Sequence, residues 1–132
     1  MTTAPFRPHT GRRCALLVAF AALAALAPPA AARDDVRAAG ACGRGASAEL
    51  RVKADHGALR VELRVRRNRT GERWRVALVH ERRVAWRGGA TTHDGGFRVR
   101  RALPDYAGAD EISARAVSPR GLTCQATVTV RG

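Results

Sequence analysis

Hydrophobic and polar residues alternate with a period of two along the chain from Ala48 onward. In the clearest stretch, Leu59, Val61, Leu63 and Val65 share one parity, and the residues between them are arginine or glutamate. Successive side chains of a strand point to opposite faces, so this alternation is typical of strands with one buried face. Six further stretches have the same pattern: Leu50 and Val52; Trp74, Val76 and Leu78; Val84 and Trp86; Phe97 and Val99; Ile112, Ala114 and Ala116; and Leu122, Cys124, Ala126, Val128 and Val130.

The pattern predicts seven short strands, because turn-forming residues separate these stretches. The connections are Asp55-His56-Gly57, Asn68-Arg69-Thr70-Gly71, His80-Glu81-Arg82, Gly88 to Gly96, Pro104 to Gly108 and Ser118-Pro119-Arg120-Gly121. We therefore expect an all-β fold, a seven-stranded antiparallel β-sandwich of the immunoglobulin or fibronectin type III kind. A small β-barrel is the alternative, because alternation alone does not distinguish it from a sandwich.

The same pattern divides the chain into three parts. Residues 48–131 form the predicted folded domain, and residues 33–47, which have no period, are predicted to be a flexible lead-in. Residues 1–32 have the features of an export signal: arginines, then an apolar stretch from Ala15 to Ala27, then Ala30-Ala31-Ala32. The apolar stretch has 13 residues, whereas a membrane span needs about 20. We expect an exported protein, secreted or held in the cell envelope, with no transmembrane anchor after signal cleavage; Sec and twin-arginine export both stay open.

Export changes how the cysteines are interpreted. Cys14 lies in the predicted signal, which leaves Cys42 and Cys124 as a pair. In an oxidising compartment such a pair favours one disulfide, whereas two free thiols would require a reducing one. If successive strands reverse direction, both cysteines lie at the same end of the domain. The bond would then stabilise the fold by roughly 4 kcal/mol, because it closes a long loop.

The chain is strongly basic, with 24 lysine and arginine residues against 11 acidic ones. Three of the arginines lie in the predicted signal, so the remaining chain still has 21 basic residues against 11 acidic ones. Sorting the connections by end places seven arginines against Glu72 and Asp94 at what we name the arginine-rich end: Arg44, Arg66, Arg67, Arg69, Arg73, Arg87 and Arg120. The opposite end has five basic and five acidic residues.

Guanidinium groups suit phosphate and carboxylate, so Arg66, Arg67, Arg69, Arg73, Arg87 and Arg120 are the candidate anion-binding residues. GC-rich codon usage is the competing explanation, since 23 of the 24 basic residues are arginine. Specific nucleic-acid recognition is not expected, because most of the few aromatic residues have core parity and base stacking needs exposed ones.

Candidate catalytic and metal-binding residues are sparse. His56, His80 and His93 each fall in a connection and are predicted to be solvated turn residues. No serine lies in a nucleophile elbow, and no ligand spacing predicts a metal or another cofactor. The alternative to a non-catalytic protein is a small secreted hydrolase that uses His56 or His80 with a carboxylate from the Pro104 to Glu111 segment.

Three strand motifs carry a resemblance to a known group. They are Trp74-Arg75-Val76-x-Leu78, Gly96-Phe97-x-Val99-Arg100 and Asp110-x-Ile112-x-Ala114-Arg115-Ala116, followed by Cys124. With these motifs the chain resembles uncharacterised small secreted single-disulfide proteins of high-GC bacteria. The resemblance implies an exported single-domain β-sandwich and transfers no catalytic residue. We expect an exported non-catalytic domain that binds an anionic envelope component or a protein partner through the arginine-rich end.

Overall fold

A computed structural model of the protein describes residues 35–131, so the predicted signal at residues 1–32 lies outside the described part. The described residues form eight antiparallel strands and no helix, which confirms the all-β class. No helix that could cross a membrane is found in this part of the chain. The strands are β1 (Asp35–Cys42), β2 (Ala46–Asp55), β3 (Ala58–Arg67), β4 (Arg73–His80), β5 (Arg83–Thr91), β6 (Gly96–Pro104), β7 (Ala109–Val117) and β8 (Thr123–Arg131).

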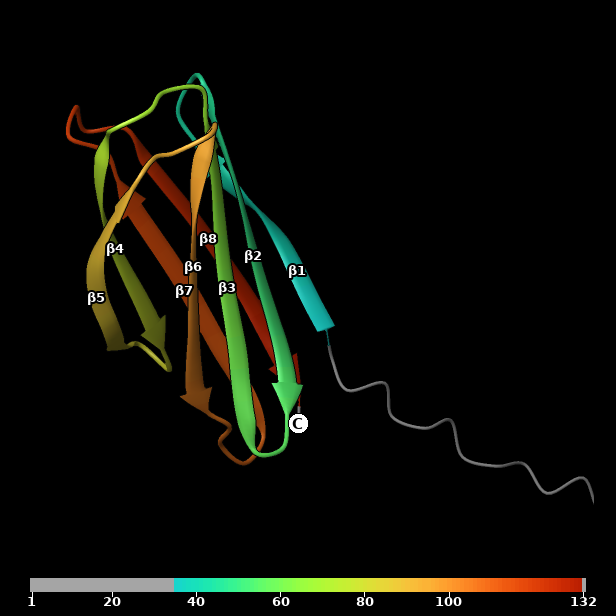
Figure 1. Ribbon diagram of the computed structural model, residues 1–132. Coiled ribbons are helices and arrows are strands. Elements are labelled where there is room, and N and C mark those ends of the chain that lie inside the picture. Colours follow the sequence, from blue (N-terminus) through green and yellow to red (C-terminus); the bar gives the residue numbers. More distant parts are fainter. Residues whose placement is uncertain (1–34, 132) are drawn as a thin grey trace, which may run out of the picture.

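The eight strands make one hydrogen-bonded sheet in the order β5-β4-β7-β8-β1-β2-β3-β6. The sheet curls so that β6, β3, β2 and β1 lie over β5, β4, β7 and β8 (Figure 1). Its two edge strands, β5 and β6, contact each other without pairing. The result is a nearly closed, barrel-like sheet. The barrel alternative therefore fits, and the seven-stranded sandwich is not confirmed.

The additional strand is β1, which occupies most of the predicted flexible lead-in. Its inward positions are Val36, Ala38, Gly40 and Cys42, and all four are only half buried. Because these side chains are mostly small, the stretch has little hydrophobic alternation and gives no strand signal in the sequence. The prediction of a lead-in over residues 33–47 was wrong for this stretch, since pairing with two neighbouring strands, and not local pattern, makes it a strand.

The strand β1 joins the two halves of the sheet. Residues Asp35 to Gly40 pair with β2, and the last two residues, Ala41 and Cys42, pair with β8. Gly40 lies where the pairing changes. A Cβ atom there would lie 2.8 Å from the Cβ of Ala48 on β2 and 3.2 Å from the carbonyl oxygen of Gln125 on β8. Glycine therefore permits β1 to approach both neighbours at once.

The seven predicted stretches correspond to β2 through β8, and their inward residues fill the interior. Trp74, Leu50, Leu59, Leu78 and Ile112 have no exposed surface. At β5 the prediction was wrong, since Val84 is 48% exposed. The pairing register of β4 and β5 shifts between Leu78 and Val79. This shift interrupts the alternation of inward and outward side chains at the start of β5. Trp86 is half buried, and the guanidinium of Arg101 lies 4.2 Å from its ring centroid.

Candidate functional site

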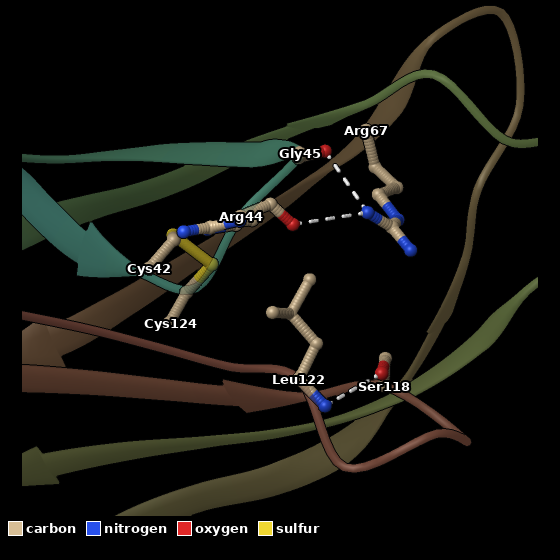
Figure 2. The surroundings of a disulfide bond; sticks show 7 residues. All are labelled: Cys42, Arg44, Gly45, Arg67, Ser118, Leu122 and Cys124. Carbon is tan, nitrogen blue, oxygen red and sulfur yellow. Dashed lines mark hydrogen bonds between the residues drawn. A yellow bond between two sulfur atoms is a disulfide. The ribbon is translucent and has the colours of Figure 1, made fainter.

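The arginine-rich end is built from the connections after β1, β3, β5 and β7, as the sequence predicted (Figure 1). The predicted disulfide between Cys42 and Cys124 is present there, between residues that are directly opposite on β1 and β8 (Figure 2). The Leu122 side chain reaches toward Gly43, where a Cβ atom would lie 2.2 Å from it. Ser118 is buried, and its Oγ accepts a hydrogen bond from the backbone N of Leu122 (2.9 Å). Ser118 therefore holds the β7–β8 turn together.

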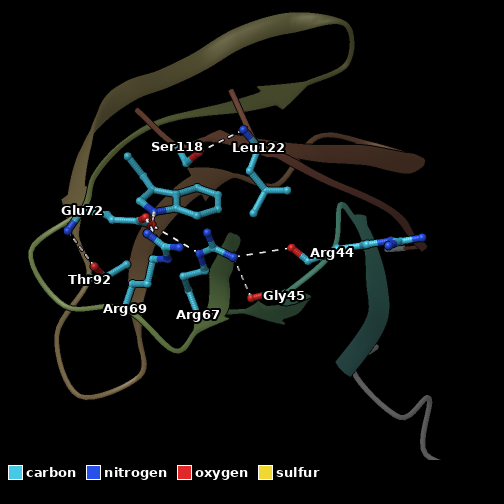
Figure 3. A network of polar contacts seen from close by, with 9 residues as sticks. Arg44, Gly45, Arg67, Arg69, Glu72, Thr92, Ser118 and Leu122 are labelled. Atoms are coloured by element: carbon cyan, nitrogen blue, oxygen red, sulfur yellow. Dashed lines mark hydrogen bonds and ion pairs between the residues drawn. The ribbon is translucent and has the colours of Figure 1, made fainter. Parts of the chain in front are cut away.

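The centre of this end is a nearly buried ion pair between Arg67 and Glu72 (Figure 3). Their side chains are 14% and 12% exposed, and Arg67 Nε lies 3.4 Å from Glu72 Oε2. Arg67 Nη1 also donates to the carbonyl oxygens of Gly45 (3.0 Å) and Arg44 (3.5 Å). The indole N–H of buried Trp74 donates to Glu72 Oε2 (3.2 Å). Arg67 thus joins the β1–β2 turn to the β3–β4 connection. Its charge is already paired with that of Glu72.

Glu72 also joins the β3–β4 connection to the start of the β5–β6 connection. Its backbone N donates to Thr92 Oγ1 (2.9 Å), and its carbonyl oxygen accepts a bond from the backbone N of Thr92 (2.9 Å). Arg69 is more exposed and lies 3.8 Å from Glu72 Oε1. Two of the six candidate anion-binding arginines therefore share one carboxylate, and that carboxylate belongs to the network that holds this end together.

The other four candidates lie in different parts of the surface. Arg66 is exposed at the end of β3, Arg73 begins β4, and Arg120 is exposed in the β7–β8 turn. Arg87 lies in the middle of β5, opposite Ala77 of β4, and not at the end where the sequence placed it. The six candidate arginines therefore do not form one cluster in the structure.

On the outer face of β1, β2, β3 and β6, arginines alternate with carboxylates; we name this the paired face. Arg100 Nε donates to Glu62 Oε2 (2.7 Å), and Arg98 and Arg64 lie 3.4 and 3.6 Å from its other oxygen. The hydrogen bond from Arg100, with the charges of the other two, lowers the pKa of Glu62. Asp35 likewise binds Arg51, whose hydrogen bond lowers the pKa of Asp35. A surface hollow of about 520 Å³ lies over this face, and Arg51, Glu62 and Arg100 contribute to its lining.

On the outer face of β4, β5 and β7 lie four exposed arginines that we name the unpaired patch: Arg73, Arg75, Arg87 and Arg115. Arg87 and Arg115 flank Ala77 in one row across the three strands, and Arg75 is two residues before Ala77 on the central strand. Within residues 35–131 no hydrogen bond or ion pair joins any of the four to a carboxylate. These guanidinium groups are consequently available to an external anion.

The opposite end contains a second buried pair, His80 and Asp110. His80 Nε2 lies 2.5 Å from Asp110 Oδ1, and the two side chains are 3% and 1% exposed. Tyr106 from the β6–β7 connection stacks on the His80 ring, with ring centroids 4.6 Å apart. The prediction that His80 is a solvated turn residue was wrong, because it is the last inward residue of β4. The parity of Trp74, Val76 and Leu78 extends to His80, and that of Ile112 and Ala114 extends to Asp110, so the sequence contained the signal.

Neighbouring acidic groups make this pair electrostatically unusual. Asp110 Oδ2 is buried and has no hydrogen-bond partner in the described part of the chain. Burial, a side-chain hydrogen bond with Asp110 and the charge of Asp110 raise the pKa of Asp105. Glu81, which follows His80, places a carboxylate oxygen within 4.8 Å of the ligand atoms of His80 and Asp110. Two carboxylates and one imidazole therefore meet at the end of the sheet opposite the arginine-rich end, and Asp105 interacts with one of these carboxylates.

The other two histidines of the described residues lie elsewhere. His56 is exposed in the β2–β3 turn and pairs with Asp55 beside it. His93 is exposed, with Nε2 3.3 Å from Asp94 Oδ2. Of the histidines considered for catalysis, the structure thus brings only His80 together with a carboxylate of the Pro104 to Glu111 segment.

Comparison with known proteins gives no match: no family model, no curated protein and no solved structure shows significant similarity to this chain.

Proposed function

We propose that this protein is an exported, non-catalytic binding domain that attaches to an anionic polymer of the cell envelope through exposed arginines. The observation that carries the proposal is the unpaired patch, Arg73, Arg75, Arg87 and Arg115, whose guanidinium groups have no carboxylate partner among the described residues. Arginine forks bind phosphate and carboxylate oxygens through paired hydrogen bonds. A surface of four such groups offers repeated contacts to a chain of anions.

The spacing of the patch suits a polymer better than a single small anion. Neighbouring strands lie about 4.8 Å apart, and alternate residues along one strand about 6.7 Å apart. Arg87 and Arg115 are separated by the central strand, and Arg73 and Arg75 lie two residues apart along it. Small residues, Ala77 and Gly89, lie between them, and the Arg73 side chain lies over Gly89, 3.5 Å from the position that a Cβ atom would take there. Arg120 in the nearby β7–β8 turn extends the positive surface toward the arginine-rich end.

The paired face is a weaker candidate, although it has more arginines. Three carboxylates there, Asp35, Asp55 and Glu62, already bind guanidinium groups, and Glu62 has three within 3.6 Å. An incoming anion would have to compete with these internal pairs. The face of β4, β5 and β7 is therefore the better candidate for anion binding, because its guanidinium groups are unpaired, although it has fewer arginines.

The strand order also supports a β-sandwich of the immunoglobulin or fibronectin type III kind, as in the small secreted proteins that the sequence resembles. The strands β2, β3 and β6 correspond to the A, B and E strands of such a sandwich, and β5, β4, β7 and β8 to C′, C, F and G. The strand β1 is then an addition that bridges A and G. The disulfide is in keeping with export, because such bonds persist in oxidising compartments.

The alternative of a small hydrolase has one observation in its favour, the contact between His80 and Asp110. A histidine oriented by a carboxylate is two thirds of a catalytic triad, and the remaining part is a nucleophile bonded to the histidine. Within residues 35–131 the only side-chain hydrogen bond of His80 is the one to Asp110. Polymer binding is therefore the function that the geometry supports best.

Binding of long-chain polyphosphate and of poly-L-glutamate to the purified protein tests the proposal. We expect binding that weakens as salt rises, because each phosphate contact releases counterions. The fourfold variant Arg73→Ala, Arg75→Ala, Arg87→Ala and Arg115→Ala should lose most of the affinity for at least one probe. Its slope of log K against log salt should fall by about three to four.

The matched control removes four arginines from the paired face: Arg51→Ala, Arg60→Ala, Arg98→Ala and Arg100→Ala. Both variants lose the same formal charge, so non-specific attraction should fall equally in both. Retained binding in the control supports the patch, and an equal loss in both variants would refute it. A protein partner that binds the wild type regardless of salt would also refute the polymer as ligand.

A further inference from the structure

We propose that His80, Glu81 and Asp110 form a binding site for a divalent zinc ion at the end of the sheet opposite the arginine-rich end. The three residues bring one imidazole nitrogen and two carboxylate oxygens within 4.8 Å of one another. Imidazole and carboxylate groups are established zinc ligands, with bond lengths of about 2.0 to 2.2 Å. The site is independent of the polymer-binding surface, which lies on the outer face of the sheet.

The fold holds His80 and Asp110 on adjacent strands and Glu81 in the turn that follows β4. His80 ends β4 opposite Ile112 of β7, and Asp110 is two residues before Ile112 on the same inward face. Glu81 and Arg82 have positive φ angles of 49° and 62°, which is typical of a two-residue hairpin turn. The backbone N of Glu81 donates to the carbonyl oxygen of Glu111 (3.1 Å), and the backbone N of Glu111 donates to Glu81 Oε1 (2.6 Å). These two bonds hold Glu81 beside the start of β7.

A second observation points to a missing ligand. Asp110 has no exposed surface, and its Oδ2 atom has no hydrogen-bond partner in the described chain. A buried carboxylate oxygen without a partner destabilises the fold, because the protein does not replace the lost hydration. A cation bound beside Oδ2 would remove that cost.

The donor set selects the class of metal. One imidazole with two carboxylates suits zinc better than calcium or magnesium, which take oxygen ligands almost exclusively. Donor atoms of a tetrahedral zinc site are about 3.4 Å apart, given these bond lengths. His80 Nε2 and Asp110 Oδ1, now 2.5 Å apart, would separate by about 1 Å. Glu81 is exposed at a turn, and because its Oε1 atom accepts the bond from Glu111 N, Oε2 is the oxygen that would bind the metal.

The simplest competing explanation is an ion pair that only stabilises the fold. That explanation accounts for the contact between His80 and Asp110. The bonds with Glu111 account for the position of Glu81, so the observation that this explanation leaves open is the Oδ2 atom of Asp110, which has no hydrogen-bond partner among the described residues. The two explanations predict different results when metal is added. If the ion pair only stabilises the fold, zinc should neither bind tightly nor raise the stability of the protein.

Titration of the full-length, EDTA-treated protein with Zn²⁺, followed by calorimetry, and with Co²⁺, followed by visible absorption, tests the site. We expect one tight equivalent, a rise in Tm with zinc and the d–d absorption of a four-coordinate cobalt site. Glu81→Gln, an exposed change that should leave the fold intact, should weaken binding at least tenfold, as should Asp110→Asn. Far-UV circular dichroism verifies that each variant is folded.

The matched control is the double variant Asp55→Asn and His56→Gln, which removes an exposed histidine–carboxylate pair at the same end. It should bind zinc as the wild type does. Absence of a tight equivalent in the wild type would overturn the proposal. Wild-type affinity in Glu81→Gln, or an equal loss in the control, would also overturn it, because binding would then belong to surface histidines.

Discussion

The two ends of the sheet each bury one charged pair, and the pairs differ in how completely their atoms are bonded. At the arginine-rich end, Arg67 and Glu72 bond to each other, and further bonds reach Trp74 and two backbone carbonyls. At the opposite end, His80 and Asp110 bond to each other, but Asp110 Oδ2 stays unpartnered. The first network is complete and stabilises turns, whereas the second has an atom still available for a ligand.

This difference shows what the number of charged residues in a segment can and cannot indicate about a functional site. The end with the most arginines uses its central arginine to hold connections together. The end with balanced charge has the less completely bonded arrangement, since two carboxylates lie close to one histidine there and Asp110 Oδ2 has no partner among the described residues. Local charge counts therefore do not identify a functional site, because they do not show which charges the protein has already paired.

The largest expected effect is on the disulfide, which only the arginine-rich end has. Replacing both Cys42 and Cys124 with alanine should lower the free energy of unfolding by roughly 4 kcal/mol, because the bond closes a loop of 82 residues. Denaturant unfolding of the variant and of the reduced wild type should give the same loss. A loss below about 1 kcal/mol would mean that strand pairing alone holds β1 in place.

The next effect concerns the buried pair at the same end. Glu72→Gln should lower the free energy of unfolding by about 2 kcal/mol, because it leaves the largely buried guanidinium of Arg67 without its counter-charge. Glu49→Gln, an exposed change on β2, is the control and should stay within about 0.5 kcal/mol of the wild type. Equal effects of the two changes would show that the pair contributes no more than a surface charge.

The corresponding change at the opposite end should have a smaller effect. In metal-free protein, Asp110→Asn should change the free energy of unfolding by less than about 1 kcal/mol. The amide keeps a contact with His80 and removes a buried charge that is only half satisfied. A loss as large as that of Glu72→Gln, measured in the same denaturant series, would contradict the difference between the ends.

The smallest effect is on Asp55, a half-buried residue at the end of β2. Hydrogen bonds from Arg60 and His56 lower the pKa of Asp55 below its ordinary value of 3.8. A lowered pKa stabilises the folded state above pH 3.8, and this contribution disappears as the pH falls through the folded-state pKa. The stability difference between wild type and Asp55→Asn should therefore be present at pH 7 and shrink below pH 4. A difference that stays constant across this range would contradict the assignment.

Much of the fold was accessible from the sequence, because a strand with one buried face leaves a period-two pattern. The stretches that became β2 through β8 follow from that pattern, apart from the bounds of β5, and the Cys42–Cys124 bond follows from the cysteine count and the export signal. The strand β1 was missed, because its inward residues are small and it is held by pairing to β2 and β8. The inward position of His80 was missed for a different reason, since it was assigned to a turn although its parity agreed with the core.

The sequence by itself thus determined the all-β class, the parity of most core residues and the cysteine pairing, since each depends on local alternation or on simple counting. Only the tertiary structure decided which charged side chains are already paired with another group of the protein. Arg67 and Glu72 are five residues apart, but Arg98 and Glu62, or His80 and Asp110, meet because strands distant in sequence pair in one register. Availability of a charged group for a ligand depends on such long-range neighbours, and a linear pattern does not contain them.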